Sequence, residues 1–375
     1  MKSIGLYIHL PWCVRKCPYC DFNSYAIKAT FPEQDYIRTL QHELLGYQKH
    51  FASRSIESIF FGGGTPSLFS EKSISSLLHF IHQHFTCDHQ MEITLEANPG
   101  TVEQARFEGF LKAGVTRLSI GIQSFNDMQL KTLGRIHSSE EAKKAITIAK
   151  TVGFNNINLD LMFGLPNQSC SSGLIDLQTA IDFSPNHISW YQLTLEPNTL
   201  FHKYPPTLPT QDDIAELQIQ GQHCLAKHDY QQYEISAYAK PNRQCRHNLN
   251  YWLFGDYIGI GAGAHGKITD KITETIFRYW NYRRPQDYLD KSKPFIGNRH
   301  RVEKKELPLE FMMNALRLQM PIPLSLFEKR TFLSLQHIQT ALDTAQKQCF
   351  LQIKDKHLVT TQQGKLFLND LLLLF

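Results

Sequence analysis

The sequence of 375 residues lacks a long hydrophobic run: none approaches the roughly 20 residues of a membrane-spanning helix. It also lacks a strong charge of either sign, with a formal net charge of +4. The most basic stretch, residues 298–305, is interrupted by Glu303. Nucleic-acid binders concentrate positive charge on one face, so we expect no nucleic-acid partner. No signal or transit peptide is apparent before the first apolar stretch, which favours a cytoplasmic location.

The eight cysteines do not have the spacing of a secreted disulfide framework. Five of them are scattered singly along the chain. The other three, Cys13, Cys17 and Cys20, fall within eight residues. This distribution indicates a reducing compartment and one cluster of thiols.

The clustered thiols follow residues 4–9, an apolar stretch that has the composition of a β-strand. A loop after a strand can direct three thiolates to one place, and thiolates favour zinc or iron–sulfur clusters. A structural zinc site needs four ligands, whereas three cysteines on a [4Fe–4S] cluster leave one iron without a protein ligand. We therefore expect a cluster, with a zinc-binding module as the alternative.

Strand-like and helix-like stretches alternate six times between residues 4 and 227. The predicted strands are 4–9, 56–61, 91–96, 117–123, 157–163 and 187–195, and the predicted helices are 34–48, 70–85, 101–113, 139–151, 174–183 and 211–227. This alternation predicts an α/β fold, a parallel sheet with helices outside, curled into a partial (β/α)6 barrel. Functional residues then belong at the carboxyl ends of the strands.

The pattern changes after the sixth unit. We expect a core at residues 1–240, an irregular extension and linker at 241–300, and a small C-terminal domain at 301–375. The last domain is predicted to be mostly helical, with one hairpin, as in a winged-helix module.

Polar and glycine residues stand where the predicted strands end. Glycines at such a position let the backbone approach a ligand closely. Carboxylates, an amide and an arginine suit a ligand that has hydroxyls and an amino-acid end. The residues in question are Gly63, Gly64, Thr65, Glu96, Gln123, Arg135 and Asp160.

The Cys-x3-Cys-x2-Cys spacing, with Tyr19 directly before the third cysteine, resembles the cluster loop of radical S-adenosylmethionine (SAM) enzymes. In that superfamily the open iron of a [4Fe–4S] cluster binds SAM. The motifs around Glu96, Gln123, Arg135 and Asp160 follow one another as in the anaerobic coproporphyrinogen dehydrogenases (HemN) and their relatives. The resemblance implies SAM contacts at all the strand-end residues above and at Tyr7 and Tyr19.

The resemblance splits into two branches. The dehydrogenase branch has a fourth cysteine where this chain has Phe22, and a longer extension before the cluster. Both departures resemble the heme chaperone branch. The stretch His247-Asn-Leu-Asn-Tyr251-Trp252 is similar to a motif proposed as heme-related in that branch. The resemblance implies heme contacts at these three named residues; otherwise His247 is a core histidine whose neighbours pack.

We therefore expect a heme chaperone that binds heme as cargo and delivers it to a heme-requiring acceptor, for example a respiratory, membrane-associated protein. The alternative is an oxygen-independent coproporphyrinogen III dehydrogenase of porphyrin metabolism, which decarboxylates propionate side chains oxidatively. SAM cleavage is compatible with both, so the residues do not decide whether the chain is an enzyme. Peripheral membrane contact and a homodimer are compatible with the sequence.

Overall fold

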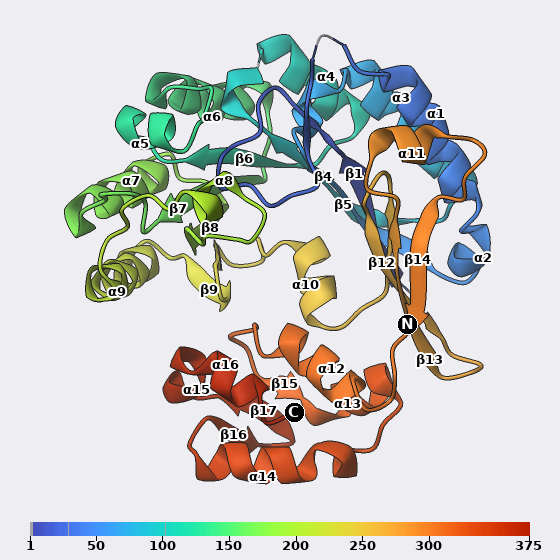
Figure 1. Cartoon of the computed structure of the whole chain (residues 1–375), viewed down its shortest axis with the longest axis vertical. Coiled ribbons are helices and arrows are strands. Elements are labelled where there is room, and N and C mark those ends of the chain that lie inside the picture. Colours follow the sequence, from blue (N-terminus) through green and yellow to red (C-terminus); the bar gives the residue numbers. More distant parts are fainter. Residues whose placement is uncertain (1–2, 29, 102) are drawn as a thin grey trace.

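The computed structural model describes residues 3–28, 30–101 and 103–375, and one twelve-stranded sheet dominates it (Figure 1). Its centre is a run of six parallel strands in the order β1-β4-β5-β6-β7-β8. These strands are β1 (Ser3–Leu10), β4 (Ser55–Gly63), β5 (Cys87–Ala97), β6 (Arg117–Gln123), β7 (Ile157–Phe163) and β8 (His187–Gln192). Because all six are parallel, their carboxyl ends meet at one rim.

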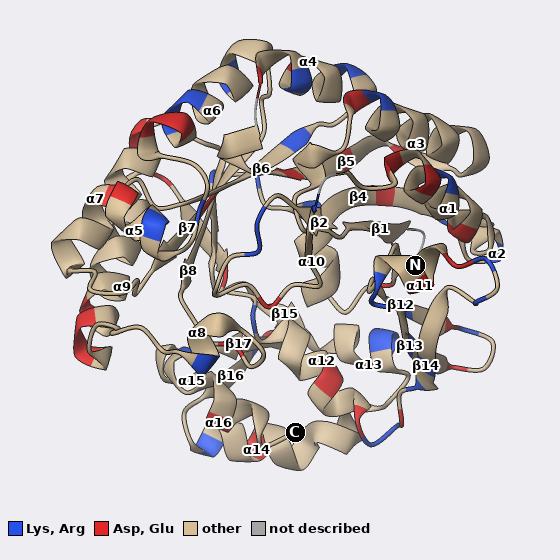
Figure 2. Cartoon of the chain, turned by 45° about the horizontal axis from the view of Figure 1, so that its top comes forward, with Lys and Arg blue, Asp and Glu red and all other residues tan. Residues whose placement is uncertain are grey.

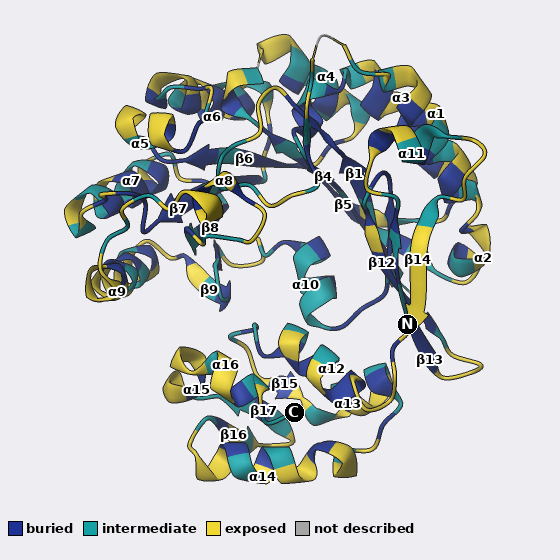
Figure 3. Ribbon diagram, in the orientation of Figure 1, coloured by how far each residue is buried: buried dark blue, intermediate teal, exposed yellow. Residues whose placement is uncertain are grey.

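Helices cover the outside of this sheet, as the outer arc of Figure 1 shows. Their inward faces are buried and their outward faces exposed (Figure 3), and basic and acidic residues are interspersed over them (Figure 2). The longer ones are α1 (Glu33–Leu45), α3 (Glu71–His84), α4 (Gln104–Ala113), α6 (Ser139–Val152), α7 (Cys170–Asp182) and α9 (Gln211–Lys227). Shorter elements are α2 (Gln48–Phe51), α5 (Asp127–Thr132), α8 (Leu200–Lys203), η1 (Pro66–Leu68) and η2 (Pro99–Thr101).

Most of the longer helices begin at a residue whose side-chain hydroxyl accepts a hydrogen bond from a free backbone N–H group. Ser138 forms a capping box with Glu141, and Ser70, Ser169 and Thr210 cap α3, α7 and α9. The strand and helix alternation thus gives the predicted partial barrel, and the prediction of this fold is confirmed.

The prediction of an irregular stretch and linker over residues 241–300 is wrong. This part holds α10 (Arg246–Trp252), α11 (Pro285–Leu289) and the strands β11 (Tyr257–Ile260), β12 (His265–Asp270), β13 (Thr275–Asn281) and β14 (Ile296–Arg301). Its glycines allow close contact inside the sheet: a Cβ on Gly259 would lie 1.9 Å from the His265 carbonyl oxygen, and one on Gly266 2.2 Å from the Tyr279 ring. Glycine here indicates close packing of strands and not a loop.

These later strands complete the sheet at both sides. β11 pairs in parallel with β1, which therefore lies between strands some 200 residues apart in the sequence. At the other edge, β9 (Gln231–Glu234) and β10 (Ala237–Ala239) form a hairpin.

The C-terminal part lies below the barrel in Figure 1 and has a hydrophobic core of its own. That core also takes Phe254 and Ile276 from the preceding segment. Its helices are α12 (Leu307–Ala315), α13 (Leu324–Thr331), η3 (Leu335–Ile338), α14 (Gln339–Lys347), α15 (Gln362–Leu366) and α16 (Leu368–Leu372), around a small sheet of β15 (Ile322–Pro323), β17 (His357–Thr360) and β16 (Leu351–Lys354). In the part of the chain that the structure describes, no helix is long and apolar enough to cross a membrane.

Candidate active site

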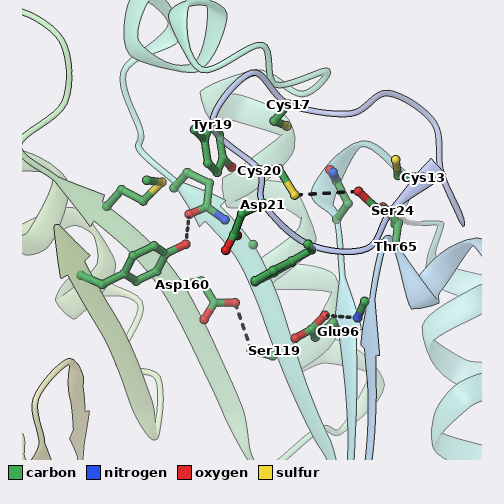
Figure 4. A pocket seen from close by; sticks show the side chains of 18 of the residues that line it. Cys13, Cys17, Tyr19, Cys20, Asp21, Ser24, Thr65, Glu96, Ser119 and Asp160 are labelled. Atoms are coloured by element: carbon green, nitrogen blue, oxygen red, sulfur yellow. Dashed lines mark hydrogen bonds between the residues drawn. The ribbon is translucent and has the colours of Figure 1, made fainter. Parts of the chain in front are cut away.

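A cavity of about 670 Å³ opens at the rim where the parallel strands end, a size typical of ligand sites. Twelve of the fifteen predicted site residues line it, and the exceptions are Tyr7, His247 and Tyr251. Figure 4 shows the three sulfurs on one loop, with the carboxyl groups of Glu96 and Asp160 nearer the strands. The strands thus bring together residues that are up to 239 positions apart, from Cys13 to Trp252.

Cys13 ends the short strand β2 (Trp12–Cys13), and Cys17 and Cys20 lie on the loop between β2 and its partner β3 (Tyr25–Ala26). Cys13 is buried, and Cys17 and Cys20 are half-buried. Burial raises the pKa of Cys13 to about 11, so this thiol stays protonated until a metal displaces its proton. Among the described residues no three His, Cys, Asp or Glu side chains already converge on a single-ion position.

The glycine loop after β4 packs directly against the cysteine loop. Backbone N–H groups of Gly64 and Thr65 donate to the carbonyls of Leu10 (2.8 Å) and Trp12 (2.7 Å). A Cβ on Gly64 would lie 2.4 Å from the Trp12 carbonyl oxygen, and Gly63 has a φ of +121°. Only glycine fits at both positions. Because these glycines have no side chain, the two loops pack together and form one wall of the cavity.

Two half-buried carboxyl groups lie on the strand side of the cavity. Glu96 accepts a hydrogen bond from the Gly63 N–H (3.2 Å), and Asp160 accepts from Ser119 (3.0 Å) and Asn158 (2.8 Å). Burial, and then the charge of Asp160, raises the pKa of Glu96 to about 8, and burial also raises the pKa of Asp160. Neither carboxyl forms an ion pair within the described ranges. A cationic ligand such as SAM, with its ammonium and sulfonium groups, fits this unbalanced pair.

Two further polar side chains, those of Arg135 and Gln123, line the same cavity. Arg135 donates to the carbonyl of Gly121 (2.7 Å) and lies 3.8 Å from the Cys17 sulfur, and its Nε atom has no partner among the described residues. Gln123 accepts from the Tyr191 hydroxyl (2.8 Å). Tyr191 stands at the end of β8, so the strand-end rule could have found it, although the sequence analysis missed it.

Tyr7 lies outside the cavity. Its hydroxyl is 2.9 Å from His9 Nδ1, while His9 Nε2 is 2.8 Å from the carbonyl oxygen of Asn23 on the cysteine loop. Burial lowers the pKa of His9 to about 4, so the ring is neutral at pH 7. A neutral ring has one donor, which the Asn23 carbonyl requires, so Nδ1 accepts from Tyr7. Both side chains therefore support the cysteine loop.

The His-Asn-x-x-Tyr-Trp motif forms α10, whose side chains point in different directions. His247 is buried, with Ser58 Oγ at 2.9 Å from Nδ1 and the Tyr251 hydroxyl at 2.7 Å from Nε2. Burial lowers its pKa to about 3, so the imidazole is neutral. Tyr251 lines a separate hollow of about 210 Å³. Trp252 lines this hollow and also the large cavity, so it is the member of the motif that reaches the cavity.

The Radical SAM superfamily model matches residues 7–171, and the HemN C-terminal domain model matches residues 302–367. The chain is 50% identical over 379 residues to the heme chaperone HemW of Haemophilus influenzae, covering 100% of this chain and 98% of that protein. It is 48% identical to HemW of Escherichia coli, with the same coverage, and 33% identical to HemW of Bacillus subtilis.

A solved structure shares the fold. The coproporphyrinogen III oxidase HemN of Escherichia coli superposes with a TM-score of 0.84 at 20% identity, over 100% of this chain and 90% of that one. The likeness extends to the C-terminal domain, because the whole chain is covered.

Proposed function

Since the chain belongs to the HemW family of heme chaperones, we propose that it binds heme and delivers it to a heme-requiring protein. The observation that carries this is the 50% identity to a heme chaperone over the full length of both chains. Phe22 supports it, because this side chain lines the cavity at the position of the dehydrogenase branch's fourth cysteine.

We propose that Cys13, Cys17 and Cys20 hold a [4Fe–4S] cluster and that SAM occupies the adjacent part of the cavity. When bound, these groups supply one-electron radical chemistry. Glu96 and Asp160 would balance the positive charge of SAM, and the glycine loop would accept its amino-acid end. The other residues proposed to bind SAM in the cavity are Tyr19, Gly63, Gly64, Thr65, Gln123 and Arg135. A SAM contact at Tyr7, which lies outside the cavity, remains a prediction.

Heme, in this proposal, enters the cavity beside Trp252, because this indole is the large aromatic surface that α10 presents there. His247 holds the helix in place through its hydrogen bond with Ser58 on β4, and Tyr251 fixes the ring from within the helix. Ligation of heme iron by His247 remains a prediction and requires this ring to leave Ser58 or Tyr251. A cytoplasmic location, a membrane-associated acceptor and a homodimer also remain predictions.

The test is a hemin titration of anaerobically reconstituted protein, followed by ultraviolet–visible spectroscopy, beside a coproporphyrinogen turnover assay on the same preparation. We expect a saturable heme spectrum and no turnover. A Cys13→Ala, Cys17→Ala, Cys20→Ala variant controls for the cluster. Turnover without heme binding would favour the coproporphyrinogen III dehydrogenase, and zinc without iron after reconstitution would favour the zinc-binding module.

A further inference from the structure

The cavity continues beyond the residues assigned to the cluster and SAM. Three later parts of the chain add Ser236 from the turn between β9 and β10, Trp252 from the end of α10, and Arg317 from the segment after α12. Arg317 is the cavity's contribution from the C-terminal domain, and no sequence motif marks it. Ser236 and Arg317 have no role in the function proposed above.

Arg317 and Trp252 form a stacked pair. The guanidinium carbon lies 4.4 Å from the centre of the indole ring, and one Nη donates to the Glu234 carboxylate (3.2 Å). The Arg317 Nε and the Trp252 Nε1 atoms are both buried and have no hydrogen-bond partner among the described residues. An unpaired buried donor is costly, so the free Nε of Arg317, a residue that lines the cavity, is suited to an acceptor bound there.

The position of Arg317 is fixed by backbone contacts. The next residue, Leu318, forms a β-bridge with Glu234, and the Gln319 N–H donates to the Tyr233 carbonyl (2.9 Å). The segment after α12 is therefore attached to β9 at the edge of the main sheet. The guanidinium is held at the cavity wall and is not on a free surface loop.

A flat aromatic surface beside a guanidinium suits a planar ligand that carries a carboxylate, and heme has two propionates. On the basis of the proposed function, we propose that Arg317 binds a heme propionate while Trp252 packs against the macrocycle. The guanidinium of Arg317 can bind a second carboxylate, because Glu234 occupies only one Nη and the Nε has no partner among the described residues.

The other cations of the cavity are less suited to this role. Arg135 is already directed to Gly121 and Cys17, and Lys16 donates to the Phe22 carbonyl (2.9 Å). Arg15 is exposed and stacks on no aromatic ring within the described residues. Arg317 combines charge, burial of its Nε and an aromatic partner.

The test compares Arg317→Met with the wild-type full-length protein in titrations with hemin and with hemin dimethyl ester, in the same detergent. We expect hemin affinity to fall roughly tenfold or more, the effect of one charge-assisted hydrogen bond, and ester affinity to change by less than about twofold. Arg317→Lys should restore part of the hemin affinity. Arg243→Met, an exposed arginine outside the cavity, is the matched control and should bind both ligands as the wild type does.

Unchanged hemin affinity of Arg317→Met would overturn the proposal while leaving heme binding by the chain intact. An equal loss for hemin and its ester would also overturn it, since the arginine would then only shape the cavity. Wild-type protein that binds neither ligand would reject the proposed function itself. The melting temperature and iron content of each variant verify that it is folded and loaded.

Discussion

At the scale of single residues, the cavity depends on positions where the charge or the size of the side chain cannot change without loss. Glu96 is a half-buried acid that forms no ion pair in the described chain, and burial raises its pKa to about 8. In the free protein at pH 7 it therefore holds a proton. A ligand with positive charge favours the ionised form, so SAM binding should release this proton.

We expect SAM affinity to rise with pH up to about 8, by up to about tenfold per pH unit, because the ionised carboxylate binds the cation. Calorimetry at pH 7 in buffers of different ionisation enthalpy should detect close to one proton released. Glu96→Gln should abolish this release and weaken binding by about tenfold. Binding heats that do not depend on the buffer would show that Glu96 is not the responsive group.

Gly64→Ala tests the contact between the two loops. The added Cβ would lie 2.4 Å from the Trp12 carbonyl oxygen, so backbone must move, and we expect a loss of about 1–3 kcal/mol in the free energy of unfolding. Iron content after anaerobic reconstitution should fall as well. Gly297→Ala, where the nearest atom is 3.3 Å away, is the control and should retain its iron. Full iron content in both variants would contradict the packing argument.

At the scale of elements, α10 depends on a carboxylate from another part of the sheet. Glu92 on β5 accepts from the backbone N–H groups of Arg246 (3.0 Å) and His247 (3.4 Å) and from the Cys245 thiol (3.5 Å). It thus caps the helix in place of a local side chain, since the N-cap residue Cys245 makes no such bond. A negative charge at this end also favours the helix dipole.

Glu92→Ala should lower the free energy of unfolding by about 1–2 kcal/mol. It should also increase amide hydrogen exchange in α10 before it does so in β6. Mass spectrometry of exchange over residues 246–252 measures this. Glu103→Ala, at the N-terminus of α4 where the side chain makes no cap bond, is the matched control. If hydrogen exchange in α10 is the same in both variants, packing alone holds the helix.

At the scale of the whole molecule, the barrel and the C-terminal domain share hydrophobic packing. Phe254 follows α10 but belongs to the core of the C-terminal domain, where its ring lies 5.7 Å from that of Phe311. The buried Lys267 ammonium lies 4.2 Å above the same ring. The two parts should therefore unfold together, and the segment that joins them should resist proteolysis.

Phe254→Ala should lower the free energy of unfolding by about 3–5 kcal/mol. It should also speed tryptic cleavage at the exposed Arg301, Lys304 and Lys305, because the neighbouring Val302 loses part of its core. Phe367→Ala, an exposed phenylalanine of the same domain, is the control. Equal cleavage rates in the two variants would show that the domains are held by other contacts.

The sequence predicted the barrel and most of the cavity because both follow from short-range patterns. Alternating elements specify parallel strands, and parallel strands place their carboxyl ends at one rim, so Glu96, Gln123 and Asp160 could be placed together. Arg317 could not, because its place depends on how a separate domain packs against β9. The role of His247 could not be predicted from its residue type, since imidazole serves equally as a ligand and as a buried hydrogen-bonding group.

The position of β1 between β4 and β11 has a consequence during synthesis. The cysteine loop is anchored by Asn23, whose amide donates to the carbonyl of Ala262 (2.9 Å), and β1 gains its second neighbour with residues 257–260. A ribosome adds roughly 5–20 residues per second, so the thiols emerge roughly 10–50 s before their anchor exists. The three thiols of the nascent chain therefore precede their finished site, and the proposed cluster should be inserted only after most of the chain has been translated.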